Sequence, residues 1–245
     1  MENIAVILVA PQGAMNVGAV CRVMANFGAS DLRLVRPCRD YLSADARRMA
    51  LKAQPILRST ARFDRLEDAL ADRHLVIGAT ARQGKYRNAC LSPRQMAGRV
   101  SALAAGTRVG LLLGREDSGL SGEEIERCQT LVTIPTAGTY SALNLAQAAG
   151  VLLYELFLEK SATGEGSAGP ERPPLADQEQ LKRLYRHMQT TLTRSGFLDA
   201  QNPTHLKRTF RRLFGRTELD AREVSILRGC LSSVDALMKS GRVDD

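Results

Sequence analysis

The chain has 245 residues, which is long enough for one sizeable domain with an appendage. Its formal net charge of +8 favours a polyanionic partner, while its five scattered cysteines and three histidines argue against a disulfide framework or a zinc site, so we expect no metal. No apolar run reaches membrane-spanning length and the sequence starts directly with a predicted strand, so we expect a soluble, cytoplasmic protein with no membrane partner.

Short apolar runs alternate with segments of helical spacing through the first 160 residues. The apolar runs predict strands at Ile4–Val9, Leu32–Val35, Leu75–Ile77, Val109–Leu113 and Leu131–Ile134. The segments with helical spacing are Val17–Phe27, Ala44–Ala53, Leu66–Ala71, Ser121–Cys128 and Asn144–Glu159. Because nearly continuous apolar strands alternate with helices, the sequence predicts an α/β fold whose mostly parallel sheet is covered on both faces.

The composition changes after residue 160. Residues 161–174 are rich in Gly, Ser, Pro and Glu and have almost nothing to bury, which predicts a flexible linker between a domain at 1–160 and a helical extension at 175–245. One helical face within Thr204–Arg216 carries four cations: Lys207, Arg208, Arg211 and Arg212. No acidic residue lies nearby, so we favour contact with a nucleic-acid backbone over a merely solvated face.

Three polar loops follow predicted strands, at Pro11–Gly18, Gly114–Leu120 and Pro135–Asn144. Open α/β sheets place their sites at the carboxyl ends of strands, so we expect these loops to form one site. Their glycines allow a ligand to approach the backbone, and Arg22 and Arg115 are available for phosphate. The pattern favours a polar cofactor held largely by main chain.

Several common sites are excluded. The first loop is neither a GxGxxG fingerprint nor a P-loop, and no Ser or Cys lies near a His as in a catalytic triad. Arg36 follows the second strand where an NAD-binding fold carries an acid, so an NADP-binding reductase stays open as an alternative. Cys21 beside Arg22 is either an activated thiol or a buried helical cysteine, and we favour the buried cysteine.

Three ordered motifs resemble one family. Asn16 followed by Arg22, then LLLGREDSGLS, then IP and YSALNLAQAAGVLLYE, are similar to the motifs of SPOUT-class, TrmH-like RNA 2′-O-ribose methyltransferases. The GFLDAQNP and RRLFGRTELDAREVSILRGCL segments resemble the C-terminal extension of the TrmJ type, which methylates cytidine or uridine ribose in the tRNA anticodon loop. The resemblance covers about the first 160 residues and the extension.

The resemblance implies tRNA as substrate, S-adenosylmethionine as methyl donor, a homodimer, a trefoil knot in the C-terminal part of the domain, and no DNA partner. It implies modification at position 32. The cofactor would be bound by Ala79, Thr80, Ala81, Gly114, Ile134, Ser141, Ala142 and Leu143. RNA would be bound by Arg22, Arg115, Lys207, Arg208, Arg211 and Arg212.

The catalytic residues implied by the resemblance are Asn16, Arg22, Glu116, Ser141 and Asn144. Each has a structural alternative: Asn16 and Asn144 as helix caps, Arg22 in an ion pair, and Glu116 as a partner that orients an arginine. Many relatives have Ser directly before Leu-Asn where this chain has Ala142, and Ser141 is the candidate substitute. Ala142 therefore leaves a catalytically silent RNA-binding module as an alternative. In the methyltransferase, we expect Arg22 to anchor RNA phosphate and stabilise the developing oxyanion, because a guanidinium is a poor base.

Overall fold

A computed structural model of the protein describes residues 1–81, 90–137, 142–163, 173–198, 209–211, 213–215 and 217–240. The chain divides into two compact units, Met1–Arg172 and Pro173–Asp245. Helix α7 (Leu145–Thr163) includes the first three residues of the range expected as linker. The boundaries 1–160, 161–174 and 175–245 stay predictions.

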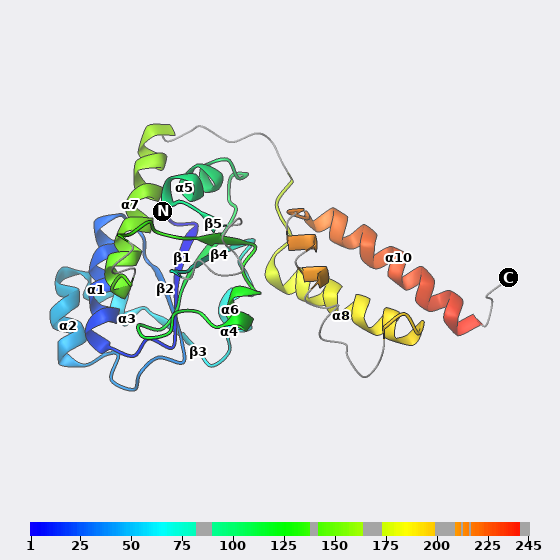
Figure 1. Ribbon diagram of the computed structural model, residues 1–245, viewed down its shortest axis with the longest axis horizontal. Helices are drawn as coiled ribbons and strands as arrows, with labels where there is room; N and C mark the ends of the chain where they lie inside the picture. The colour runs from blue at the N-terminus through cyan, green and yellow to red at the C-terminus, as the bar shows by residue number, and fades with distance from the viewer. Residues whose placement is uncertain are drawn as a thin grey trace. The chain divides into compact units, whose positions relative to one another are not determined.

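A parallel sheet forms the centre of the first unit (Figure 1). Its seven strands lie in the order β3-β2-β1-β6-β4-β7-β5, and every described pairing is parallel. The strands are β1 (Ile4–Val9), β2 (Asp31–Val35), β3 (Ala61–Phe63), β4 (Leu75–Ala79), β5 (Cys90–Leu91), β6 (Val109–Leu113) and β7 (Thr130–Val132). The sequence patterns missed β3 and β5 because these edge strands are three and two residues long and carry no apolar run.

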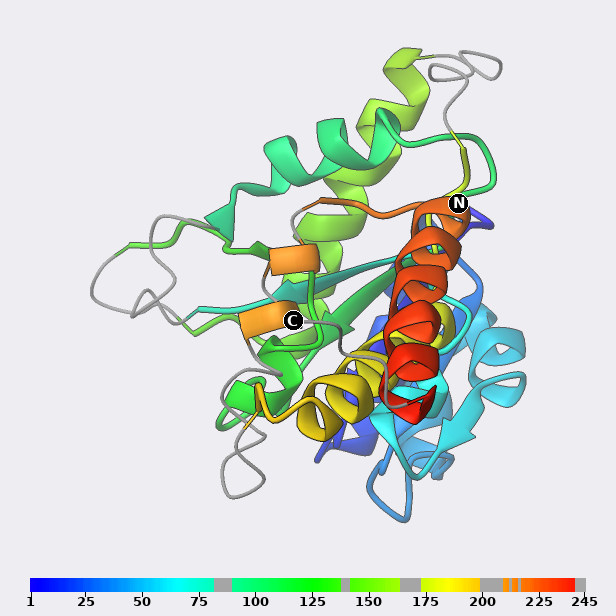
Figure 2. The ribbon, with the colours of Figure 1, turned by 90° about the vertical axis from the view of Figure 1, so that its right-hand side faces the viewer.

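Helices cover both faces of the sheet, as the apolar strands predict. Val6 and Leu8 of β1 point into one core, and Ala5, Ile7 and Val9 point into the other. The first core is covered by α1 (Ala14–Asn26), α2 (Ala44–Ala50), the 3-10 turn η1 (Leu51–Ala53), α3 (Gln54–Arg58), α5 (Pro93–Ser101) and α7. Short helices α4 (Leu66–Leu70) and α6 (Gly122–Ile125) cover the second core. Figure 2 shows α5 and α7 on the same side of the sheet. The predicted α/β fold is confirmed.

Helix α1 begins three residues earlier than the sequence predicted. Gly13 is its N-cap residue, so Asn16 lies inside the first turn, and the prediction that Asn16 caps a helix starting at Val17 is wrong. The helix packs closely on α2 at Gly18, where a Cβ would lie 2.1 Å from the carbonyl oxygen of Ala46. A glycine is therefore required for this contact.

The second unit is helical. Asp177 caps α8 (Gln178–Arg194) through a reciprocal capping box with Gln180, and α10 (Ala221–Ser240) lies beside α8 (Figure 1). Their shared core is small and contains Ala176, Leu181, Leu184 and Val224. Within the described part of the chain, no helix is long and apolar enough to cross a bilayer.

Candidate functional site

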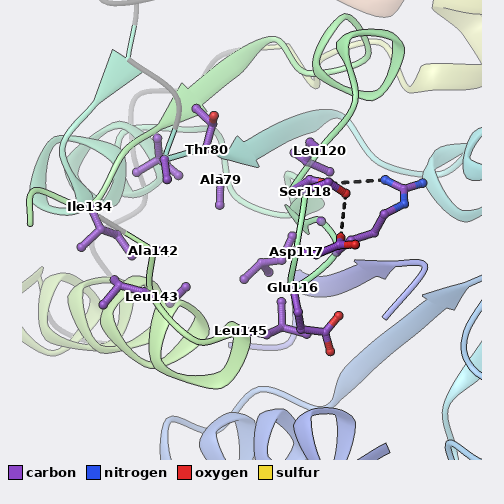
Figure 3. Close-up of a pocket in the computed structure, with 17 residues that line it drawn as sticks. Ala79, Thr80, Glu116, Asp117, Ser118, Leu120, Ile134, Ala142, Leu143 and Leu145 are labelled. Atoms are coloured by element: carbon purple, nitrogen blue, oxygen red, sulfur yellow. Dashed lines mark hydrogen bonds between the residues drawn. The ribbon is translucent and has the colours of Figure 1, made fainter. Parts of the chain in front are cut away.

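The loops after β4, β6 and β7 surround a pocket at the carboxyl edge of the sheet (Figure 3). In the close-up, Glu116, Asp117 and Ser118 lie on one side, and Ile134, Ala142 and Leu143 lie on the other. The lining combines apolar residues with polar and charged residues of the loop after β6. Such a pocket suits a ligand with apolar and polar parts.

The predicted cofactor residues lie around this pocket. All those that the structure describes line it: Ala79, Thr80, Ala81, Gly114, Ile134, Ala142 and Leu143. Ser141 lies outside the described residues. Sequence reasoning missed other lining residues from the same segments, namely Leu113, Asp117, Ser118, Gly119, Leu120, Val132, Leu145 and Ala148. Their only sequence signal is adjacency to the predicted residues.

Gly114 closes the β6 loop into a tight turn. The backbone N–H groups of Arg115 and Gly119 donate to each other's carbonyls, at 3.2 and 2.9 Å. A Cβ on Gly114 would lie 2.1 Å from the carbonyl carbon of Gly119, and Gly119 has φ +67. Both positions therefore require glycine, and the turn holds the loop against the pocket.

Arg115, which is partly buried, forms an ion pair with the buried carboxylate of Glu124. Its two terminal nitrogens donate to the two carboxylate oxygens at 3.0 Å each, and one of them also reaches the carbonyl of Gly119. Burial by itself would raise the pKa of Glu124, but hydrogen bonds from Arg115 and from the Ser121 backbone outweigh it and hold that pKa below its usual range. The same pair raises the pKa of Arg115. The RNA contact of Arg115 stays a prediction, and an RNA phosphate would have to compete with Glu124 for the same guanidinium.

Sequence reasoning missed Glu124, although a signal was present. Ser121 and Glu124 form a capping box at the start of α6, with the Ser121 side chain accepting from the Glu124 backbone and the Glu124 side chain accepting from the Ser121 backbone. The S-x-x-E spacing is the sequence signature of this motif.

Glu116 lies at the N-terminus of α1. Its carboxylate accepts from the backbone N–H groups of Gln12 at 2.8 Å and Gly13 at 3.1 Å, and from Nδ2 of Asn16 at 2.9 Å. A negative charge is favourable at a helix N-terminus, where backbone N–H groups lack helical partners. The carboxylate therefore caps α1 from more than a hundred residues away, and it points away from the pocket toward that helix (Figure 3).

A chain of amides joins Glu116 to α7. Oδ1 of Asn16 accepts from Nδ2 of Asn144 at 2.9 Å, and Oδ1 of Asn144 accepts from the backbone N–H of Ala146 at 2.9 Å. A carboxylate only accepts and a backbone N–H only donates, so the two ends fix the orientation of both amides. Asn144 is the N-cap of α7, as one sequence interpretation proposed. The structure thus brings three predicted catalytic residues together.

Arg22 is not part of this cluster. Its side chain is exposed on the same side of α1 as Met15, whereas the apolar residues Val17, Val20 and Met24 face the core. Neither the pocket lining nor any ion pair described in the structure includes it. The ion pair considered as the structural alternative for Arg22 is therefore not found among the residues that the structure describes. Cys21 is fully buried, and burial raises its pKa to about 12, so the buried interpretation holds.

The basic face predicted in the extension is described only in part. Lys207, Arg208 and Arg212 lie outside the described residues. The guanidinium of Arg211 lies 5.7 Å from the centre of the Tyr185 ring, which is a cation–π contact within the extension.

Comparison with known families identifies both units. Residues 3–154 match the SpoU rRNA methylase family, and residues 179–243 match the family described as tRNA methyltransferase TrmJ, C-terminal domain. The chain belongs to the SpoU methylase family and has the C-terminal domain of the TrmJ type, which confirms the predicted family.

Individual relatives agree over the full length. The tRNA (cytidine/uridine-2′-O-)-methyltransferase TrmJ of Escherichia coli strain K12 is 35% identical over 250 residues and 100% of both chains. The TrmJ of Salmonella typhimurium strain LT2 is 35% identical over 96% of this chain and 97% of its own. The crystal structure of TrmJ from Z. mobilis ZM4 aligns with a TM-score of 0.81 and 31% identity, covering 94% of this chain and 98% of that chain. These relatives favour neither the NADP-binding reductase nor the silent module.

Proposed function

We propose that the protein is a cytoplasmic, S-adenosylmethionine-dependent methyltransferase that methylates a ribose 2′-hydroxyl in the tRNA anticodon loop, at cytidine or uridine 32. The supporting relatives are tRNA (cytidine/uridine-2′-O-)-methyltransferases by name. The observation that carries the proposal is that every described residue of the predicted cofactor set lines one pocket beside the Glu116–Asn16–Asn144 chain.

The residues of the pocket fit the proposed cofactor. Ile134, Leu143 and Leu145 offer apolar surface for a purine ring, and the loop at Gly114–Leu120 offers backbone groups for hydrogen bonds. Asp117 brings negative charge to the pocket lining, which suits a cationic sulfonium. When bound, the cofactor supplies an activated methyl group.

The chain's own residues supply positioning. Methyl transfer needs the ribose oxygen held in line with the methyl carbon, and fixed polar groups lower the entropy cost of that arrangement. Asn16 and Asn144 form a rigid pair of amides at the edge of the pocket loops. Glu116 already accepts three hydrogen bonds, so we assign it the role of holding α1 and Asn16 in place rather than that of a free base.

Arg22 would complete the site from a second copy of the chain. Within one chain it is exposed and apart from the pocket, although the resemblance assigns it to the reaction. A guanidinium stays charged at neutral pH, so it can bind RNA phosphate and stabilise the oxyanion that develops as the 2′-hydroxyl loses its proton to phosphate or solvent.

The surface around Arg22 supports a homodimer. Helix α7 exposes four large apolar side chains, those of Val151, Tyr154, Phe157 and Leu158. Met15 of α1, a helix that packs against α7, is 58% exposed. Large apolar side chains that gather on the exposed side of a helix are typical of an interaction surface. Light scattering should therefore detect a dimer at micromolar concentration, and a stable, active monomer would contradict this.

The trefoil knot is part of the same proposal. It would involve the segment that runs from β6 through β7 into α7, which also carries the pocket residues. Its support is the family assignment and the position of β4 between the later strands β6 and β7.

Mapping of ribose methylation by mass spectrometry tests the function. The full-length protein is incubated with unmodified tRNA transcripts, with and without S-adenosylmethionine, and we expect one cofactor-dependent 2′-O-methyl group at nucleotide 32. The structure of a relative with 27% identity and a TM-score of 0.51 concerns 2-OH methylation of C/U34 on tRNA, so a methyl group found at nucleotide 34 would revise only the modified position. Asn16→Ala should abolish product, whereas the exposed control Asn26→Ala on the same helix should not. No methylation by the folded wild-type protein would overturn the proposal.

A further inference from the structure

Helix α8 carries a basic stripe that none of the assigned roles uses. Arg183, Arg186 and Arg194 are exposed, and their spacing of three and then eight residues places them along one side of the helix. Side-chain exposure is 60% for Arg183 and 42% for Arg194. The opposite side of α8 is anchored in the small core of the extension through Leu181 and Leu184.

The stripe is only partly neutralised. Glu179 is the one acidic residue of α8, and it is shared between Lys182 at 3.2 Å and Arg183 at 3.3 Å. Asp235 of α10 lies 3.5 Å from Arg194 and also pairs with His187. No ion pair of Arg186 occurs among the residues that the structure describes. Positive charge therefore remains for an external anion.

An exposed aromatic ring ends the stripe. Phe197, three residues beyond Arg194, is 67% exposed, whereas the next residue, Leu198, is buried. The turn is fixed by Gly196 at φ +76 and by the Leu198 N–H, which donates to the carbonyl of Leu192 at 3.0 Å. Because this turn directs Leu198 inward, the exposed position of Phe197 follows from the local backbone.

We propose that the α8 stripe and Phe197 form an RNA-loop-binding surface, in which Arg183, Arg186 and Arg194 contact backbone phosphates and Phe197 stacks on an unpaired base. An acidic protein partner could pair its carboxylates with the arginines, but it would offer no nucleobase on which the exposed ring of Phe197 could stack. Aromatic stacking next to a basic track is the usual means of binding unpaired nucleotides. The inference rests on the proposed tRNA substrate and identifies the surface of the extension that binds it.

A pair of matched triple variants tests the stripe. Arg183→Gln, Arg186→Gln and Arg194→Gln together remove three charges from α8, and Arg222→Gln, Arg228→Gln and Lys239→Gln remove three from exposed positions on α10. In the full-length protein, the α8 triple should weaken tRNA binding at least tenfold and reduce the slope of log affinity against log salt by about 2 to 3, since each phosphate contact contributes ~0.7–0.9. The α10 triple should change affinity less than threefold.

Arg186→Gln alone guards against misfolding, because no described ion pair is lost with it. It should reduce the salt slope by ~0.7–0.9 without lowering the thermal midpoint. Equal effects of the two triple variants would overturn the proposal. Failure of the wild-type protein to bind or methylate tRNA would instead contradict the proposed function, and that result is distinguishable because it precedes any mutation.

The proposed stacking of Phe197 on an unpaired base is tested by substitutions that leave the charge unchanged. Phe197→Leu should weaken binding of an anticodon stem-loop about fivefold or more, Phe197→Tyr should retain it, and neither should alter binding to a duplex without a loop. Equal loss on loop and duplex would contradict stacking. Competition by poly-glutamate as effective as competition by RNA would show that the surface binds acidic protein and would overturn the assignment to RNA.

Discussion

The pocket loops and helix α8 use arginine in opposite ways. In the loop after β6, both terminal nitrogens of Arg115 contact Glu124, and the neighbouring carboxylate of Glu116 caps α1. On α8, Arg186 has no ion pair within the described residues, and Arg183 shares Glu179 with a lysine. The formal charge of +8 does not distinguish these uses. The partner of each cation decides whether it builds the site or remains available to bind RNA.

Gly114→Ala should have the largest effect and tests whether the pocket loop after β6 is held rigidly. A Cβ would meet the backbone of Gly119 at 2.1 Å, and backbone cannot move aside as a flexible side chain can. We expect the free energy of unfolding to fall by about 4 kcal/mol or more. Chemical denaturation measures this, with Gly122→Ala as control because open space surrounds that glycine. A small loss for Gly114→Ala would show that the loop adapts and is not held rigidly.

Arg115→Gln should have the next largest effect. It removes the bidentate partner of the buried Glu124 carboxylate and leaves only the 3.6 Å contact with Arg36, which should cost about 2 to 3 kcal/mol of stability but leave the salt slope of tRNA binding unchanged. Arg94→Gln is the control, since that exposed arginine lies 3.7 Å from Glu155 and should matter by less than about 1 kcal/mol. A reduced salt slope in Arg115→Gln would show that Arg115 contacts RNA phosphate, as the α8 arginines are proposed to do.

The same pair predicts a pH dependence. The pKa of Glu124 lies below its ordinary value of 4.5, so the stabilisation is present above that pH and is lost as the pH falls below it. The stability gap between wild type and Arg115→Gln should therefore narrow on acidification below about pH 4.5. Denaturant titrations at pH 7, 5, 4 and 3 measure the gap.

Glu116→Gln should cost less. The amide keeps the shape but loses the charge at the N-terminus of α1, so we expect a loss of about 1 to 2 kcal/mol in stability. The kcat of methyl transfer should fall by more than the loss of stability explains, because Asn16 loses its fixed orientation. The exposed Glu123→Gln is the matched control. An unchanged kcat in Glu116→Gln would show that the Glu116–Asn16–Asn144 chain does not contribute to the reaction.

Arg36→Gly should give the smallest change, with the opposite sign. Arg36 has φ 49, a left-handed conformation that disfavours a side chain, so glycine should stabilise the fold by about 0.5 to 1 kcal/mol. Its contact with Glu124 at 3.6 Å adds to a carboxylate already paired with Arg115. Arg48→Gly in α2 is the control and should destabilise. Destabilisation by Arg36→Gly would show that the ion pair of Arg36 with Glu124 stabilises the fold more than the left-handed backbone conformation of Arg36 destabilises it.

The sequence predicted what depends on local pattern. Strands such as β1, buried on both faces, were predicted from their apolar runs, and Asn144 was predicted as a cap from its position before α7. The start of α1 was predicted wrongly because its cap comes from Glu116, which is distant in sequence. The ion pair considered for Arg22 is not found among the described residues, where Arg22 is exposed, because a helical pattern alone does not show which neighbouring elements cover each face.

The central claim is that one reaction site needs side chains from two copies of the chain. Arg22→Ala and Asn16→Ala should each be inactive, although both fold. Co-expression with two different tags isolates the mixed dimer, in which one site has both Asn16 from one chain and Arg22 from the other. Tritium transfer from S-adenosylmethionine to tRNA should then recover to about half the wild-type rate per dimer. Complete inactivity of the mixed dimer, with a wild-type pair isolated in the same way remaining active, would place Arg22 in the site of its own chain and contradict the claim.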